Sequence, residues 1–259
     1  MFRRLMLALG ILSLCGVPAF AGYRPFTFTY DTYPMVKGEI EFEQWVTYLG
    51  HKPDEHGYTR IEFREEIEYG LTDNFRLSAY VPNWAYENSK EVSGVRFDSV
   101  GLEGIWLLSN PVTDAIGVGL YGEINIGEHD LELEQKLLLH KDWGKWTVAY
   151  NLVFETELED VFGGGDTEVE GVLGNTFGVA YSLSPQWRSG AEVIVESIFR
   201  DWTKYETTTV YAGPVISYQG SQIKGTNWSW WVTFTPTFQL TGEKDAPDFQ
   251  FRLIASISF

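Results

Sequence analysis

The chain has 259 residues and a formal net charge of −17, from 19 basic and 36 acidic side chains. Nucleic acid is therefore set aside as a partner, because binding to it depends on Lys and Arg residues that neutralise phosphates. Hydrophobic residues at 44%, aromatic residues at 16% and a single cysteine also exclude a disordered tail, a collagen-like repeat and a disulfide scaffold.

The chain opens with the pattern of a secretory signal peptide. Two arginines precede an apolar run over residues 5–17, and Ala19-Phe20-Ala21 forms a small-x-small cleavage site. About 13 apolar residues are too few to span a bilayer as a helix, which takes roughly 20. A lipoprotein signal at Cys15 is disfavoured, because the bulky Leu14 precedes that cysteine. We therefore expect residues 1–21 to be removed on export, which leaves a chain that has to fold without disulfides.

Residues 22–38 read GYRPFTFTYDTYPMVKG and are harder to assign. Phe26, Phe28 and Tyr30 alternate as they would in a strand. The segment could be a periplasmic lead-in, a plug in the lumen of a barrel or an extra strand, and the sequence leaves these alternatives open.

From Glu39 onward, apolar and polar residues alternate with a period of two. In 39–49, Ile40 and Phe42 share one face while Glu41 and Glu43 share the other, which indicates a strand with two different faces. Similar runs follow at 60–69, 75–82, 97–108, 115–126, 131–140, 146–156, 171–182, 187–198, 209–218, 228–239 and 249–259. The pattern predicts an all-β fold, an antiparallel transmembrane β-barrel of about 12 strands of the outer-membrane type over residues 39–259.

Alternation alone would also fit a soluble sandwich, but two further features favour the barrel. Short connections take turns with mostly longer polar ones at 50–58, 83–96 and 158–170, as in barrels with short periplasmic turns and long outer loops. The apolar face also carries an aromatic row, typical of the zone where hydrocarbon meets headgroups. At the short-turn end of the strands this row comprises Tyr69, Phe75, Trp106, Trp146, Tyr181, Trp187, Tyr218, Trp228 and Phe259.

The last strand adds a third feature. It ends FQFRLIASISF, with Phe251, Leu253, Ile257 and the terminal Phe259 on one face. A final amphipathic strand that ends in Phe resembles the signal by which the barrel-assembly machinery recognises bacterial outer-membrane proteins. We therefore expect the protein to reside in the outer membrane of a Gram-negative cell, with membrane lipid and the assembly machinery as partners.

Three residues fit the strand pattern poorly. Pro214 and Pro236 fall inside expected strands, and each removes a donor from the ladder, so we expect bulges or strand ends there. Glu65 falls on the lipid-facing side of its strand, where we expect a bulge or a register slip in place of a charge in lipid.

Two stretches, YPMVKGEIEFEQ (33–44) and EYGLTDNFRLSAYVP (68–82), resemble the opening of the outer-membrane family linked to the meta-pathway of phenol degradation and its uncharacterised relatives. In that family a start of the form leP-x-G-x-x-E-x-E precedes an E-Y-G-x-T-D turn. The match covers about the first quarter of the chain by motif and the whole chain by strand layout. The resemblance implies an outer-membrane barrel that moves small molecules, and it carries over no catalytic or ligand residues.

The face opposite the apolar one carries many charges, and in a barrel this face lines the lumen. The lumen and selectivity candidates are Glu39, Glu41, Glu43, Arg60, Glu62, Arg64, Glu66, Glu68, Arg76, Glu103, Glu123, Glu132, Glu134, Arg188, Glu192 and Arg252; Lys136, Glu155 and Glu196 share the same face. Buried carboxylates need water or counter-ions, so either water fills the lumen or ion pairs close it. The carboxylate excess predicts a narrow, cation-preferring channel or transporter for small solutes, with its selective surface on the first two strands.

The alternative is a closed barrel with a structural or surface-binding role. An outer-membrane hydrolase is disfavoured, because none of the four histidines stands in a recognisable His-x-Ser motif. These histidines are His51, His56, His129 and His140. A metal site in the loop that holds His51, Asp54, Glu55 and His56 is also disfavoured, because a loop with two histidines and no cysteine is more often merely solvated. We expect no catalytic residue, no cofactor and no metal site.

Overall fold

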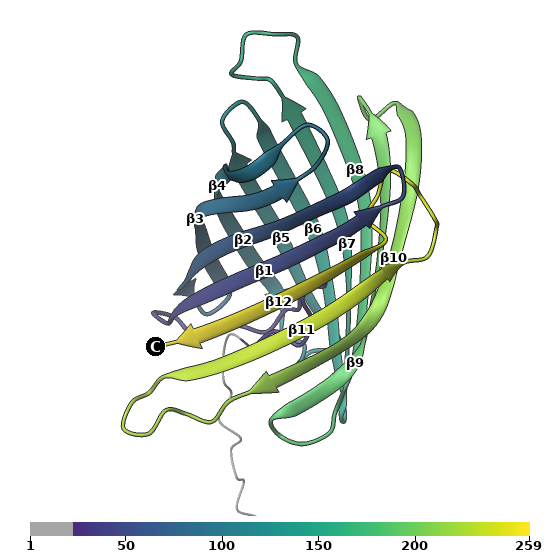
Figure 1. The fold of residues 1–259 in the computed structure, drawn as a ribbon. Helices are drawn as coiled ribbons and strands as arrows, with labels where there is room; N and C mark the ends of the chain where they lie inside the picture. Colours follow the sequence, from purple (N-terminus) through teal and green to yellow (C-terminus); the bar gives the residue numbers. More distant parts are fainter. Residues whose placement is uncertain (1–22) are drawn as a thin grey trace, which may run out of the picture.

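The computed structural model describes residues 23–259, so the expected signal peptide at 1–21 lies outside the described residues. Twelve antiparallel strands close into one barrel, in which each strand pairs with the next and β12 pairs with β1 (Figure 1). This confirms the expected fold class. The strands are β1 (Ile40–Lys52), β2 (Glu55–Thr72), β3 (Phe75–Asn88), β4 (Ser93–Ser109), β5 (Gly117–Ile126), β6 (Leu131–Trp143), β7 (Trp146–Glu159), β8 (Glu168–Ser182), β9 (Trp187–Arg200), β10 (Lys204–Gln219), β11 (Ser229–Gln239) and β12 (Phe249–Ser258). Within residues 23–259, no helix is long and apolar enough to cross a membrane.

The two faces of the barrel wall differ as the period of two predicts. Outward apolar side chains are exposed, with Leu102 on β4 55% exposed and Leu120 on β5 43% exposed. Their inward neighbours Glu103 and Tyr121 are buried. A water-soluble protein rarely exposes a large continuous apolar surface, whereas lipid covers the outside of a membrane barrel.

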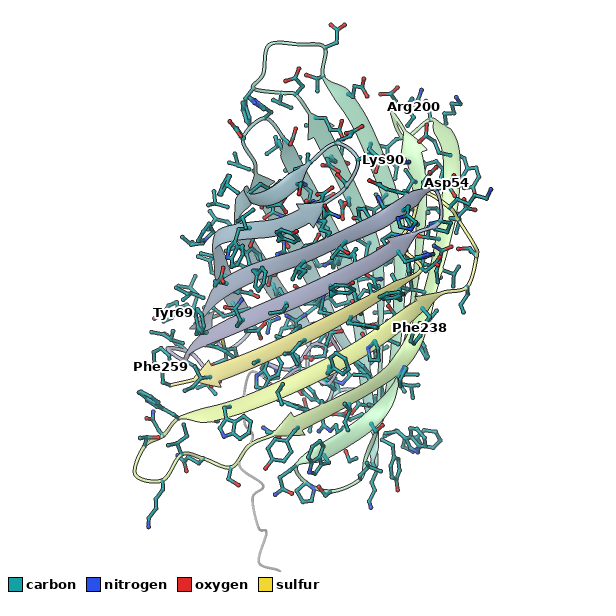
Figure 2. All side chains as sticks on the ribbon, in the orientation of Figure 1. Asp54, Tyr69, Lys90, Arg200, Phe238 and Phe259 are labelled. Carbon is teal, nitrogen blue, oxygen red and sulfur yellow. The ribbon has the colours of Figure 1, made fainter. Side chains whose placement is uncertain are left out.

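Aromatic side chains gather on the outward face at the end of the barrel where the chain ends. The rings of Trp228 and Phe259, for example, lie 5.7 Å apart. Figure 2 shows Tyr69 and Phe259 at this end, which we call the short-turn end, and Asp54 and Lys90 at the opposite end, which we call the hairpin end. The two ends of the barrel therefore differ in chemistry, as expected of a wall with an interfacial girdle.

Two of the three long connections expected from the sequence are mostly strand, so that expectation is wrong for them. β1 continues to Lys52 and β2 begins at Glu55, while β3 continues to Asn88 and β4 begins at Ser93. Backbone pairing needs no apolar face, so polar residues extend these hairpins beyond the alternating region. The third connection, 160–167, is a loop between β7 and β8.

Neither proline lies at a bulge or a strand end, which corrects the expectation from the sequence. Pro214 pairs in register with β9, and Pro236 pairs in register with β12. Between β10 and β11 the ladder is interrupted from Ala212 to Ile216 without a change of register, which sets the two prolines opposite each other. Two residues without an N–H group thus share one interruption of the ladder.

A bulge lies beside Glu65, as expected, but the extra residue is on the neighbouring strand. The register between β2 and β3 shifts between Arg64 and Glu66, so that Val81 and Pro82 of β3 both lie opposite Glu65. On its other side Glu65 lies opposite Gln44 of β1, a second polar residue on the outward face.

Candidate functional site: the lumen of the barrel

Residues 23–37, which we call the lumen segment, lie inside the barrel up to Met35, and Val36 and Lys37 are exposed at its rim. Phe26, Thr27 and Thr32 are fully buried, and the purple trace that precedes β1 runs within the lower half of the barrel in Figure 1. The segment contains no strand, so it does not form the extra strand that its alternation allowed. It occupies the lumen toward the short-turn end.

Glu192 on β9 holds the middle of the lumen segment. Its carboxylate accepts hydrogen bonds from the backbone N–H groups of Thr27, Phe28 and Thr29 at 2.9 to 3.0 Å. It also accepts one from the hydroxyl of Thr235 at 2.6 Å. The Glu192 side chain is fully buried. Hydrogen bonds to an ionised acceptor are stronger than those between neutral groups, so this carboxylate fixes three consecutive residues.

Two further wall residues hold the backbone of the lumen segment. The Asn151 amide on β7 accepts a hydrogen bond from the Tyr30 N–H at 2.6 Å and donates one to the Tyr30 carbonyl at 2.9 Å. The Thr233 hydroxyl on β11 donates to the Arg24 carbonyl at 2.5 Å. Loss of any of these partners would leave a buried backbone group without a hydrogen bond, which is costly.

A row of residues, six of them glutamates, ascends around the wall of the lumen. Cross-strand pairing brings one residue per strand into register from β1 to β7. These residues, which we call the carboxylate row, are Glu41, Glu68, Ser78, Glu103, Glu123, Glu134 and Glu155. Because barrel strands are tilted, such a row ascends the wall. It begins at Glu41, beside the start of β1 at the short-turn end, and ends at Glu155, close to the hairpin end of β7.

Basic side chains neutralise only part of the carboxylate row. The ion pairs are Arg76–Glu68 at 3.4 Å, Arg64–Glu123 at 2.7 Å and Lys136–Glu134 at 2.8 Å. Within the described range, the members that form no ion pair are Glu41, Glu103 and Glu155. The row therefore keeps an excess of negative charge.

The densest group of carboxylates lies on β1 and β2, where the sequence predicts the selective surface. Glu41 and Glu43 lie directly opposite Glu68 and Glu66. One oxygen from each of Glu43, Glu66 and Glu68 lies within 4.8 Å of the other two. Both oxygens of Glu66 are buried without a hydrogen-bond partner in residues 23–259. A buried carboxylate without a partner is unfavourable, so this group has capacity for a cation or for protons.

On the hairpin side of the lumen segment, the lumen contains a cavity of about 210 Å³. Phe28 and Tyr30 of the segment line it. Four carboxylates face the same space, namely Glu132, Glu134, Glu155 and Glu196. Gly174 lies opposite Glu196 in the ladder and has no side chain to fill the gap. At roughly 30 Å³ for each water in the liquid, the cavity has room for a small hydrated solute.

Besides Glu192 and Glu43, three further predicted lumen residues outside the row contact the lumen segment. Glu39 is at the rim, where its carboxylate accepts a hydrogen bond from a segment N–H at 3.1 Å. The guanidinium of Arg252 lies over the Phe28 ring at 4.2 Å, and that of Arg188 lies over the Tyr23 ring at 4.7 Å. These cation–π contacts hold the segment against the wall.

Arg60 and Glu62 belong to a separate ion-pair network toward the hairpin end. Arg60 contacts Glu62 at 2.7 Å, Glu87 at 2.9 Å and Asp98 at 3.1 Å. This network joins β2, β3 and β4 and does not contain a member of the carboxylate row.

Three buried aromatic residues that were not predicted share the lumen face with the charges. These residues are Trp45, Tyr121 and Trp231. They pack in one cluster with Tyr23 and Tyr30 of the lumen segment, and the Trp231 indole donates to Glu41 at 2.6 Å. The signal was present in the sequence, because Trp45 stands at the same alternate positions as Glu41 and Glu43.

Two of the four histidines contact a carboxylate. His140 is buried inside the lumen, where its Nδ1 accepts from the Thr32 N–H at 3.3 Å and lies 3.4 Å from the Thr32 hydroxyl, and its Nε2 lies 3.5 Å from Asp142. His51 pairs with Asp248 at 2.6 Å in an exposed position, and among residues 23–259 no hydroxyl is hydrogen-bonded to its ring. A His–Asp pair without a nucleophile lacks the first member of a catalytic triad.

Comparison with known proteins places the chain in a family. Residues 18–252 match the family described as "Family of unknown function (DUF6662)". Because this match spans most of the chain, the chain belongs to that family. The match does not confirm the resemblance to the meta-pathway family. No curated protein matches the chain in sequence.

Two solved structures share the fold. The COG4313 outer membrane channel from Pseudomonas putida F1 has a TM-score of 0.60 at 12% identity, with 92% of this chain and 100% of that chain covered. The NanC porin has a TM-score of 0.53 at 11% identity, with 84% of this chain and 98% of that chain covered. At these identities the likeness shows the fold alone, which is that of outer-membrane channels and porins.

Proposed function

Since the family's function is unknown, we propose one from the lumen of this member: a channel in the outer membrane that passes small solutes, prefers cations and is closed by the lumen segment. The observation that carries the proposal is the carboxylate row, which runs in register across seven strands from one end of the lumen toward the other. The two similar structures are named a porin and an outer membrane channel, which agrees with this proposal.

Electrostatics supports the preference for cations. A narrow passage lined by carboxylates attracts cations and repels anions, and the low-dielectric wall strengthens the effect. Glu155 faces the cavity without an ion pair in the described range, so its charge acts on any solute that enters. Of the three bases that line the cavity, Arg64 and Lys136 are each paired with a carboxylate, and Arg252 forms no ion pair among the described residues, so four carboxylates face one unpaired base.

Closure follows from the anchors of the lumen segment. With Phe26 and Thr32 fully buried, a solute can pass this level only if the segment shifts. We propose that residues 23–37 are the closing element, which is the plug among the three alternatives that the sequence left open.

Placement in the membrane rests on the outer surface of the barrel. The exposed apolar band and the aromatic row fit membrane lipid. Leu253 on β12 and Phe259 directly after it are 38% and 44% exposed on the outward face. There they and their neighbours Phe251 and Ile257 are accessible to the assembly machinery before the barrel closes. We propose this strand as the assembly signal.

A permanently closed barrel with a structural or surface-binding role is the second candidate. The observation that favours it is the satisfied anchor at Glu192, which holds three backbone N–H groups at once. The two candidates differ in whether the segment ever leaves its site.

The test is single-channel recording of the refolded protein in a planar bilayer. Discrete openings whose reversal potential in a salt gradient favours potassium over chloride would support the channel. A folded barrel that never conducts, even when its Glu192 anchor is removed, would favour the closed barrel.

A further inference from the structure

The guanidinium of Arg24 lies in a box of side chains that is suited to organic cations. Its Cζ atom is 4.0 Å from the ring centre of Tyr30 and 4.6 Å from that of Trp45. Its Nη1 donates to Glu43 at 3.3 Å, and the Trp45 indole donates to the same Glu43 oxygen at 2.7 Å. Aromatic faces and a carboxylate around one planar cation are the groups that recognise a guanidinium.

The box offers more acceptors than Arg24 uses. We define the Arg24 box as Tyr30, Glu43, Trp45, Glu66 and Glu68. Both oxygens of Glu66 and one of Glu43 are buried without a donor among residues 23–259, and the Nη2 of Arg24 is buried there without an acceptor. Among the same residues, the three carboxylates of the box form ion pairs with only two guanidiniums, those of Arg24 and Arg76. The box is therefore more negative than its present occupant requires.

Most of the box belongs to the barrel wall. Glu43 and Trp45 lie on β1, and Glu66 and Glu68 lie on β2. Only Tyr30 would depart with the lumen segment. A displaced segment would thus leave a vacant aromatic and acidic site inside the lumen, with Arg76 as the remaining ion-pair partner.

We infer that the Arg24 box is a binding site for organic cations with a guanidinium head group, and that Arg24 is its built-in occupant in the closed barrel. A solute of this class competes with Arg24 for the same carboxylates and ring faces. Binding of the solute and release of the lumen segment then favour each other, because the solute and Arg24 cannot occupy the box at the same time. Only the role in passage rests on the proposed channel; binding to the box does not.

The first experiment uses the Arg24→Ala protein, in which the box loses its occupant. Methylguanidinium should produce a saturable change in tryptophan fluorescence, since Trp45 forms one wall of the box. Urea has a similar planar shape without the charge, and it should produce no saturable change at the same concentrations. In the wild-type protein Arg24 competes, so methylguanidinium should bind at least about tenfold more weakly.

Paired variants on β2 locate the site. In the Arg24→Ala background, Glu66→Gln should weaken methylguanidinium by about tenfold, which corresponds to about 1.4 kcal/mol. Glu62→Gln makes the same chemical change on the same strand, but Glu62 pairs with Arg60 outside the box. This control should leave the affinity unchanged. Equal losses in the two variants, or no binding in either, would overturn the inference.

A measurement on the wild-type protein tests the same inference without any variant that could fail to fold. Methylguanidinium should speed hydrogen exchange of the lumen-segment amides at least severalfold, while urea at the same concentration should not. Unchanged exchange would overturn the competition with Arg24.

Saturable binding of calcium in place of methylguanidinium to the Arg24→Ala protein would instead assign Glu43, Glu66 and Glu68 to a metal ion and overturn the inference. If methylguanidinium binds to a barrel that never conducts, only the proposed channel fails.

Discussion

The anchor at Glu192 gives the sharpest prediction, because one side chain holds three consecutive backbone N–H groups of the lumen segment. Glu192→Gln keeps the size of the side chain, removes its charge and turns an NH₂ group toward these donors. A hydrogen bond to a charged group contributes about 1.5 to 3 kcal/mol net. The loss of about two such bonds amounts to about 3 kcal/mol, which is roughly a hundredfold in the population of the displaced segment.

Hydrogen exchange at the amides of Thr27, Phe28 and Thr29 measures this population directly, because exchange requires the segment to leave its anchor. The matched control is Glu196→Gln on the same strand. Glu196 faces the cavity, and among the described residues it forms no hydrogen bond with the lumen segment. We expect faster exchange in Glu192→Gln alone. Exchange rates that match the wild type in both variants would refute the role of Glu192 as the anchor.

Three further predictions concern the lumen. Gly178→Ala should speed segment exchange by about tenfold or more, because a Cβ there would lie 2.7 Å from the Phe26 ring and overpacking costs about 1 to 3 kcal/mol; Gly122→Ala, whose Cβ meets nothing within 4 Å, should not. Burial raises the pKa of the Asp31 carboxyl, so the neutral acid favours the seated segment. Segment exchange, divided by the intrinsic exchange rate at each pH, should therefore slow as pH falls from 7 through this raised pKa, and Asp31→Asn should reduce the slowing; a dependence unchanged in that variant would contradict the assignment. Glu155→Gln should lower the potassium-to-chloride permeability ratio about 15-fold, since a unit charge about 5 Å away in water favours potassium by about 0.8 kcal/mol and disfavours chloride by the same amount, and an unchanged ratio would remove Glu155 from the passage.

The barrel could be predicted because its two faces meet different media along every strand. A period of two records that difference locally, as in the contrast between Leu102 and Glu103 on β4. The bulge at Glu65 was predictable for the same reason, since a carboxylate breaks the apolar face. The strand ends were less predictable, because the hairpins beyond Lys52 and Asn88 are held by backbone pairing that leaves no apolar signature.

The lumen segment could not be placed from the sequence, because its partners are far away along the chain. Thr27 and Glu192 are separated by 165 positions. Each partner alone resembles an ordinary strand residue, and only the closed barrel brings them together. The arrangement of the prolines could not be predicted for the same reason, since Pro214 and Pro236 lie opposite each other only through the register of β10 and β11.

The central claim is that the lumen passes cations when the lumen segment moves. The most direct test is the reversal potential of Glu192→Gln channels in a potassium chloride gradient, recorded beside the wild type. The account predicts more frequent openings than in the wild type, with a reversal potential displaced toward the equilibrium potential of potassium. A reversal potential displaced toward that of chloride would contradict it.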